Sequence, residues 1–118
     1  MNILLIDDDR DCLESLAAVI EPAGHSCDIY TVPEEAVAAY DGVKHQAVIT
    51  DIKMPGLSGI QVLRLIKAKN GKAKVLLMTG YGDVDTAIAA VNYGAYYFFS
   101  KPVNIDEIIE VLERIARE

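Results

Sequence analysis

Short apolar runs alternate with longer segments of helical period along the whole chain. The runs cover residues 2–6, 27–30, 46–50, 75–78 and 96–99, and each predicts a strand. Within them, apolar and polar positions alternate only weakly, which is typical of strands that helices cover on both faces. Between the runs, apolar residues recur every three or four positions, as on the buried side of a helix.

Local signals mark where the predicted helices begin. Ser58, with Gln61 three residues later, predicts a capping box, and Asn104 with Glu107 predicts a similar start for the last helix. Pro33 suits the first position of a helix, because its missing N–H would have no partner there. These signals place helix starts directly after the second, third and fifth strands.

The remaining boundaries follow from turn residues. The first helix is expected at about residues 10–21, ended by Pro22 and Gly24. The fourth is expected to start at the cap Asp83 and to close at Gly94. On the fourth and fifth helices, the residues expected on the buried faces are Val84, Ala87, Ile88, Val91, Ile105, Ile108, Ile109, Leu112 and Ile115.

Five strand–helix units in strict alternation predict the fold class. We expect an α/β domain, with a doubly wound five-stranded parallel sheet flanked by five helices. A chain of 118 residues without a repeat or linker predicts a single domain over residues 1–118.

Composition and charge narrow the classes of function. The chain is 52% hydrophobic with a net charge of −7, and its lysines and arginines form no basic stripe, which argues against direct nucleic-acid binding. No apolar stretch approaches the ~20 residues of a membrane span, and no signal peptide precedes the first strand, so we expect a cytoplasmic protein without a membrane partner. Cys12 and Cys27 are expected to be packed free thiols, and His25 and His45 to be surface residues.

Polar and charged residues collect where the predicted strands end. Asp7 and Asp8 follow the first strand, Asp51 the third, Thr79 the fourth, and Lys101 comes just after the fifth. Because the carboxyl ends of parallel strands form one edge of the sheet, these side chains are expected to meet there. Clustered carboxylates with a hydroxyl and a lysine predict a site for a divalent cation, Mg²⁺, and a phosphoryl group.

Structural explanations exist for the same residues. The run Asp7-Asp8-Asp9 could cap the first helix, and for Asp9 a cap is the favoured interpretation. Asp51 could cap a turn before Pro55, while Thr79 and Lys101 could each be exposed loop residues.

Five motifs in this order resemble the receiver domains of two-component response regulators. They are Ile6-Asp7-Asp8-Asp9, the segment from Asp51 to Gly56 with Gly59, Met78-Thr79-Gly80, Gly94-Ala95 and Lys101-Pro102. The resemblance extends from end to end and implies a flavodoxin-like strand order of 2-1-3-4-5. It also implies that a sensor histidine kinase or a phosphotransfer protein donates a phosphoryl group to the chain. The conformation would then change and signal to an output domain or a partner protein. The resemblance further implies that a homodimer forms on phosphorylation.

The resemblance also implies a role for each site residue. Asp51 would be the phosphoacceptor. Asp7, Asp8, Asp51 and the backbone carbonyl of Lys53 would bind Mg²⁺. Thr79 and Lys101 would contact the phosphoryl group.

The resemblance also indicates residues that would take part in the conformational switch and in hydrolysis of the acyl phosphate, and one peptide bond that would be cis. Thr79 and Phe98 would form the switch, although a purely structural core role for Phe98 is an equal alternative. Lys53 and Tyr81 would flank the path of the water that hydrolyses the acyl phosphate. The family also suggests a cis Lys101-Pro102 bond, while X–Pro bonds in general are mostly trans.

Three other functions share part of the pattern. A phosphatase of the haloacid-dehalogenase type also uses an aspartate nucleophile, but position 11 is Asp11 instead of threonine or valine and no acidic pair follows Lys101. A flavodoxin-like electron carrier would need Ser, Thr and Gly in the first loop, which is rich in aspartate here. A receiver used only for docking would usually lack an acidic residue or the lysine.

Overall fold

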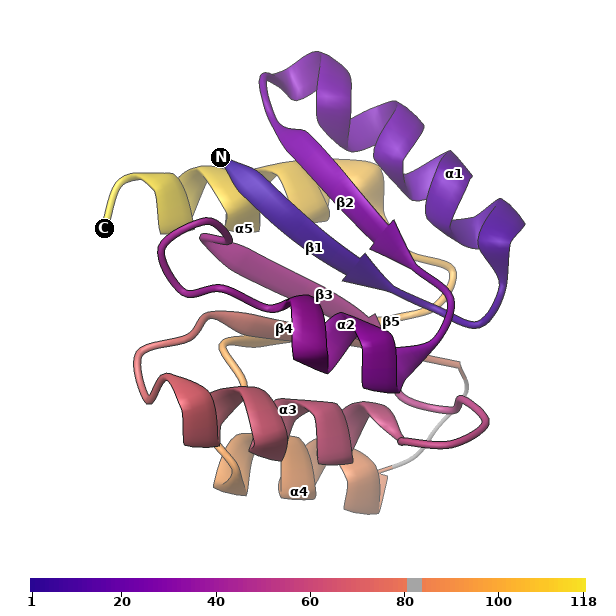
Figure 1. The fold of residues 1–118 in the computed structure, drawn as a ribbon. Helices are drawn as coiled ribbons and strands as arrows, with labels where there is room; N and C mark the ends of the chain where they lie inside the picture. Colours follow the sequence, from indigo (N-terminus) through magenta and orange to yellow (C-terminus); the bar gives the residue numbers. More distant parts are fainter. Residues whose placement is uncertain (81–83) are drawn as a thin grey trace.

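The computed structural model describes residues 1–80 and 84–118 (Figure 1). The strands are β1 (Asn2–Ile6), β2 (Ser26–Tyr30), β3 (Ala47–Asp51), β4 (Val75–Thr79) and β5 (Tyr97–Ser100). The helices are α1 (Arg10–Ile20), α2 (Pro33–Ala39), α3 (Gly59–Lys69), α4 (Val84–Asn92) and α5 (Ile105–Ala116), with a short 3₁₀ turn, η1, at Glu21–Ala23. The elements follow the predicted order, and the ends that were predicted are found within two residues of their expected positions.

The strands form one parallel sheet in the order β2-β1-β3-β4-β5. Helices α1 and α5 cover one face, and α2, α3 and α4 cover the other (Figure 1). This is the doubly wound α/β architecture that the alternating pattern predicts, with the flavodoxin-like strand order that the resemblance implies.

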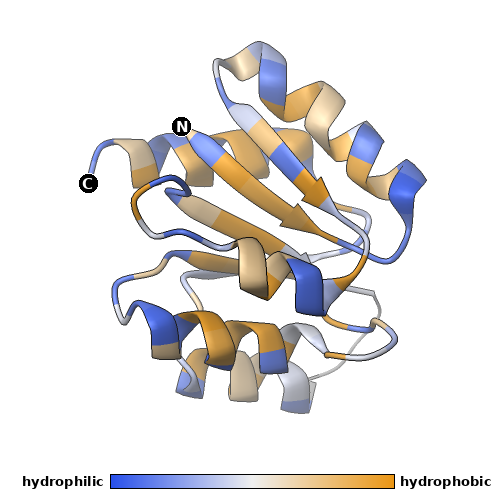
Figure 2. Ribbon diagram, in the orientation of Figure 1, coloured by the Kyte–Doolittle hydropathy of each residue, from blue (hydrophilic) through white to orange (hydrophobic). Residues whose placement is uncertain are grey.

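A hydrophobic core lies on each face of the sheet. β3 and β4 are buried at every position, which explains why their sequences hardly alternate. Figure 2 shows apolar residues concentrated in the sheet and hydrophilic residues distributed over the helices. Among the described residues, Phe99 has the largest fully buried side chain, and it belongs to the core on the α1 and α5 side.

Strand register brings the candidate site residues to one edge. Ile6 pairs with Thr50, so the next residues on the two strands, Asp7 and Asp51, come side by side. Asp51 in turn pairs with Met78, and Thr79 pairs with Ser100. The carboxyl ends of β1, β3, β4 and β5 therefore lie next to one another along one edge of the sheet.

Local capping signals are confirmed. Asp9 accepts hydrogen bonds from the N–H groups of Asp11 and Cys12 at the start of α1. Ser58 and Gln61 form the predicted capping box at α3, and the Asn104 side chain accepts from the Glu107 N–H at α5. Gly94 follows α4 with φ of +85°, a left-handed conformation that favours glycine. The predicted cap Asp83 lies outside the described residues.

Some expected burial is wrong. Ile88 and Val91 on α4 and Ile105 on α5 are exposed, whereas Ala90 and Val111 are buried in their place. Helical period shows that a stripe is apolar, but it does not show how far the neighbouring elements cover it. Among the described helices, none is long and apolar enough to cross a membrane.

The two histidines differ, contrary to the expectation that both lie at the surface. His45 is buried, and its Nδ1 accepts a hydrogen bond from the Asp41 N–H at 3.2 Å. That leaves Nε2 to donate to the Asp28 carboxylate at 2.8 Å. His25 is half-buried and lies 3.0 Å from the N-terminal amino group.

The cysteines also differ from each other. Cys12 is exposed on α1, so the expectation of a packed thiol is wrong there. Cys27 packs against the core, and burial raises the pKa of its thiol to about 11.

Candidate functional site

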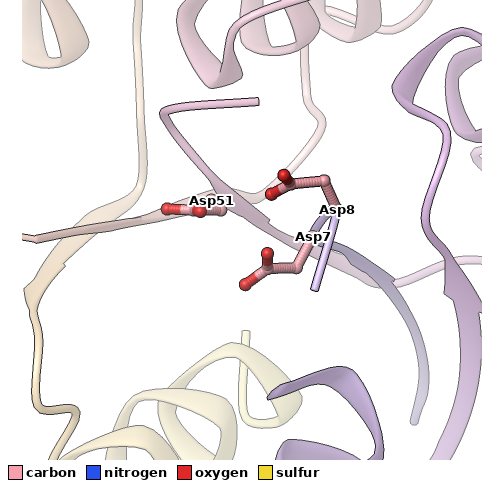
Figure 3. Close-up of side chains that lie close together, drawn as sticks. All are labelled: Asp7, Asp8 and Asp51. Atoms are coloured by element: carbon pink, nitrogen blue, oxygen red, sulfur yellow. The ribbon is translucent and has the colours of Figure 1, made fainter. Parts of the chain in front are cut away.

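Three carboxylates gather at the carboxyl edge of the sheet. Asp7 and Asp8 follow β1, and Asp51 ends β3; Figure 3 shows their side chains converging on the same space. One oxygen from each residue lies within 4.8 Å of the others. This spacing is short enough for one small cation to contact all three groups.

Asp7 is the most constrained of the three. It is buried, and its Oδ1 accepts a hydrogen bond from the Asp9 N–H at 3.0 Å, while no hydrogen bond reaches Oδ2. Burial raises the pKa of the carboxyl; the hydrogen bond from Asp9 opposes this, and the neighbouring charge of Asp51 raises the pKa further. A buried carboxylate oxygen without a hydrogen bond is costly unless a cation compensates it.

Asp51 is also buried but presents its carboxylate to the cluster. Its Oδ1 accepts a hydrogen bond from the Ile52 N–H at 2.9 Å, which orients the group. The Ile52 N–H also points towards the Met78 carbonyl of β4, 3.1 Å away. Asp51 is therefore held in place from both its own strand and the next one.

Lys101 brings the compensating charge. Its Nζ lies 3.4 Å from Asp51 Oδ1 and 3.6 Å from Asp7 Oδ2, the oxygen that lacks a hydrogen bond. Burial lowers the pKa of the lysine, but the charges of Asp51 and Asp7 outweigh burial and raise it overall. The ammonium therefore stays protonated beside the carboxylates.

Thr79 completes the edge. It is buried at the end of β4, and its carbonyl accepts a hydrogen bond from the Lys101 N–H at 2.7 Å. This backbone contact ties the segment after β5 to the end of β4. The Lys101-Pro102 peptide bond that follows is cis.

The other candidate residues lie in different places. Asp9 points its carboxylate at the start of α1 and serves as the cap. Lys53 is exposed in the segment after β3. Phe98 is partly buried and packs against the core on the α2, α3 and α4 side, while Tyr81 lies outside the described residues.

Two features near the site were not predicted from the sequence. An open groove of about 340 Å³ runs from Asp7 and Lys101 along α1 and the start of α5, and the exposed Cys12 lines it. The Glu34 carboxylate accepts a hydrogen bond from the Leu57 N–H in the segment between β3 and α3. A contact between residues 23 positions apart leaves no local signal in the sequence.

Comparison with known proteins gives a consistent family. A protein-family model described as "Response regulator receiver domain" matches residues 3–113. The chain is 33% identical over 117 residues to the transcriptional regulatory protein FixJ of Bradyrhizobium diazoefficiens, covering 99% of this chain and 57% of that protein. It is 37% identical over 121 residues to the transcriptional regulatory protein PgtA of Salmonella typhimurium, covering 99% of this chain and 28% of that protein.

Solved structures agree with this family and with the fold. A response regulator receiver domain protein from Clostridium thermocellum superposes with a TM-score of 0.93 at 32% identity, covering 97% of this chain and 92% of that one. The NtrX protein of Brucella abortus superposes with a TM-score of 0.87 at 32% identity, covering 97% of this chain but 26% of that one. The chain is thus similar to a whole receiver domain protein and to a quarter of a much longer one.

Proposed function

The chain belongs to the response regulator receiver domain family, and from this premise we propose that Asp51 is its phosphoacceptor. Receiver domains accept a phosphoryl group rather than turn over a substrate as a conventional enzyme does. The observation that carries the assignment to Asp51 is that its carboxylate lies 3.4 Å from Lys101 Nζ and within 4.8 Å of the Asp7 and Asp8 carboxylates. The family match favours this function over a dehalogenase-type phosphatase or a flavin carrier, and the intact acidic cluster with its lysine argues against a receiver used only for docking.

The residues around Asp51 fit a Mg²⁺ ion. Asp7, Asp8, Asp51 and the backbone carbonyl of Lys53 would hold it, because hard oxygen ligands are those that Mg²⁺ prefers. Support comes from the buried Oδ2 of Asp7, which accepts no hydrogen bond and lies 3.6 Å from Lys101 Nζ, so that it remains available as a metal ligand. When bound, the ion neutralises charge on the phosphoryl oxygens, which otherwise repel a carboxylate nucleophile.

The proposed transfer step uses the chain's own groups. An Asp51 carboxylate oxygen attacks the phosphorus of a phosphohistidine, and an acyl phosphate forms as the phosphorus–nitrogen bond breaks and the imidazole leaves. Lys101 stabilises charge on the phosphoryl oxygens, and the Thr79 hydroxyl donates a hydrogen bond to one of them. Later hydrolysis returns Asp51 to a free carboxylate.

Phosphorylation would act through a change of conformation. Thr79 and Phe98 are proposed as the switch, because Phe98 pairs with Leu77, two residues before Thr79 on β4. A phosphoryl group that binds Thr79 better in one arrangement shifts the population towards that arrangement.

Partners follow from the family. The receiver family implies a histidine kinase as partner. We propose that this kinase donates the phosphoryl group in the cytoplasm, directly or through a phosphotransfer protein. The chain spans 57% of FixJ and 28% of PgtA, both transcriptional regulatory proteins. We propose that residues 1–118 form a single receiver domain that signals to an output domain or a partner protein. Phosphorylation favours a homodimer. Neither direct nucleic-acid contact nor a membrane partner is part of this proposal.

The test is phosphorylation by acetyl phosphate with Mg²⁺, followed by mass spectrometry. The wild-type chain should gain one phosphoryl group, labile at alkaline pH, and Asp51→Asn should gain none. Asp11→Asn is the matched control, since it removes the same charge from an exposed position on α1 and should leave the reaction intact. A label that persists in Asp51→Asn, or that maps to Ser58 or Thr79, would falsify the assignment.

A further inference from the structure

The segment between β3 and α3, residues 52–58, is anchored at its base beside the site. The Gly59 N–H donates to the Ile52 carbonyl at 2.8 Å, and the Ile52 N–H donates to Asp51 Oδ1 at 2.9 Å. A Cβ atom on Gly59 would lie 2.7 Å from Ile52 Cα, so the two ends of the segment are in close contact. The base is therefore fixed one residue after Asp51.

The far part of the segment is anchored by a residue of α2. Glu34 Oε1 accepts a hydrogen bond from the Leu57 N–H at 3.2 Å. Gly56 has φ of +83°, and a Cβ atom there would lie 2.5 Å from Glu34 Oε1 and 2.9 Å from Oε2. The carboxylate thus lies directly against the backbone at Gly56 and Leu57.

α2 can serve as a firm support for this contact. Pro33, at the first position of the helix, is buried, and Ala36 and Val37 pack into the core below the sheet. Glu34 and Glu35 both lie in the first turn, where a negative carboxylate interacts favourably with the positive end of the helix dipole. Both glutamates are exposed, but Glu35, within the part of the chain that the structure describes, makes no hydrogen bond to this segment. The contact with Leu57 is thus a separate property of Glu34.

Lys53 lies between the two anchors, and its backbone carbonyl is a ligand in the proposed metal site. We propose that Glu34 is a positioning residue for that site: its carboxylate holds the 52–58 segment and so restricts the backbone at Lys53. This inference rests on the proposed function. A restricted backbone loses less freedom when it contacts an ion, so the contact favours Mg²⁺ binding. Groups that orient metal ligands without touching the metal commonly change affinity by about tenfold or more.

The test is Mg²⁺ titration of the full chain by calorimetry, without any phosphoryl donor. Glu34→Ala should weaken Mg²⁺ binding by about three- to tenfold, less than the tenfold or more that is typical of groups bonded directly to a metal ligand, because Glu34 acts through the backbone of the segment. Glu34→Gln keeps a carbonyl oxygen that can accept from Leu57 and should bind Mg²⁺ nearly as the wild type does. Glu35→Ala, the matched control, removes the same charge from the same helix turn and should leave the affinity unchanged.

Two further readouts separate positioning from loss of general stability. Hydrogen exchange at the Leu57 amide should be faster in Glu34→Ala than in Glu35→Ala. With acetyl phosphate, the Mg²⁺ concentration for half-maximal phosphorylation should rise in Glu34→Ala while the rate at saturating Mg²⁺ stays unchanged. If Glu34→Ala does not fold, Glu34→Asp keeps the charge on a side chain one methylene shorter and should show the same weaker binding.

Different failures have different meanings. Equal Mg²⁺ affinity of the wild type and the folded Glu34 variant, Ala or Asp, overturns the positioning role and leaves the proposed function intact. A wild-type chain that binds no Mg²⁺ and is not phosphorylated overturns the proposed function, and this inference with it.

Discussion

Lys101 Nζ lies 3.4 Å from Asp51 Oδ1, although Asp51 ends β3, Lys101 follows β5, and β4 separates these two strands in the sheet. The contact depends on the hydrogen bond between the Lys101 N–H and the Thr79 carbonyl, which brings the segment after β5 across the end of β4. A single cation is thereby placed between two buried carboxylates of the site, Asp51 and Asp7.

Removing the positive charge of Lys101 should slow phosphorylation more than it weakens Mg²⁺ binding. Lys101→Met should lower the rate with acetyl phosphate by at least about tenfold, or ~1.4 kcal/mol of barrier, because the phosphoryl charge loses a fixed partner. Mg²⁺ affinity, measured by calorimetry, should fall less or even rise as a repelling charge is lost. Lys72→Met, at an exposed lysine, is the control; an unchanged rate in Lys101→Met would refute the assigned role.

Mg²⁺ should stabilise the fold. The ion binds the assembled carboxylates and not the dispersed unfolded chain, so the unfolding free energy rises by about 2.7 kcal/mol at a concentration of one hundred times the Kd. Asp51→Asn should raise the melting temperature of the metal-free protein, since one of three crowded charges is lost. Thermal melts with and without millimolar Mg²⁺ test both points. The proposed metal site would be refuted if Mg²⁺ leaves the melting temperature of the wild type unchanged and Asp8→Ala does not change the melting temperature either.

The buried His45 should contribute to stability. His45→Ala removes the hydrogen bonds to Asp28 and to the Asp41 N–H and the ring that stacks on Tyr40. We expect a loss of about 1–3 kcal/mol in the free energy of unfolding, measured by urea denaturation. His25→Ala, at the half-buried histidine, should cost less. Equal small losses in the two variants would contradict the importance of the Asp28 contact.

The hydrogen bond between His45 and Asp28 should also make the stability of the fold depend on pH. The hydrogen bond from His45 is the main cause that lowers the pKa of Asp28 from its ordinary 3.8. A carboxyl with a lower pKa in the folded state contributes stability that is present above the unfolded pKa and is lost as pH falls through the folded value. Urea midpoints measured below pH 4 should therefore fall less steeply with acid in Asp28→Asn than in the wild type. Parallel curves would rule this contribution out.

Lifetime of the acyl phosphate is open to a test at two positions. Lys53 and Tyr81 would flank the water that attacks the phosphorus, and neither is a carboxylate or amide that could orient this water. Replacing Lys53 with Asn and Tyr81 with Glu together should speed phosphate loss by roughly tenfold, or ~1.4 kcal/mol of barrier. Decay of the labelled protein after removal of the phosphoryl donor measures this. Equal decay in wild type and double variant would show that hydrolysis is controlled elsewhere.

The sequence by itself determined the order of the elements, the fold class and the helix starts. Strand and helix periods depend on neighbouring residues, and the caps at Asp9, Ser58 and Asn104 join groups two or three positions apart. The sequence also indicated which aspartates come together, because parallel strands place their carboxyl ends at one edge. Such features need no knowledge of how distant segments pack.

Only the tertiary structure decided what covers each side chain. His45 is buried, and its hydrogen-bond partner Asp28 lies 17 residues earlier in the sequence. Glu34 reaches Leu57 because α2 packs beside the segment after β3. Ile88 and Ile105 have the period of buried residues yet remain exposed. Burial depends on the neighbours that the folded chain brings to a residue, and the period of one helix carries no information about those neighbours.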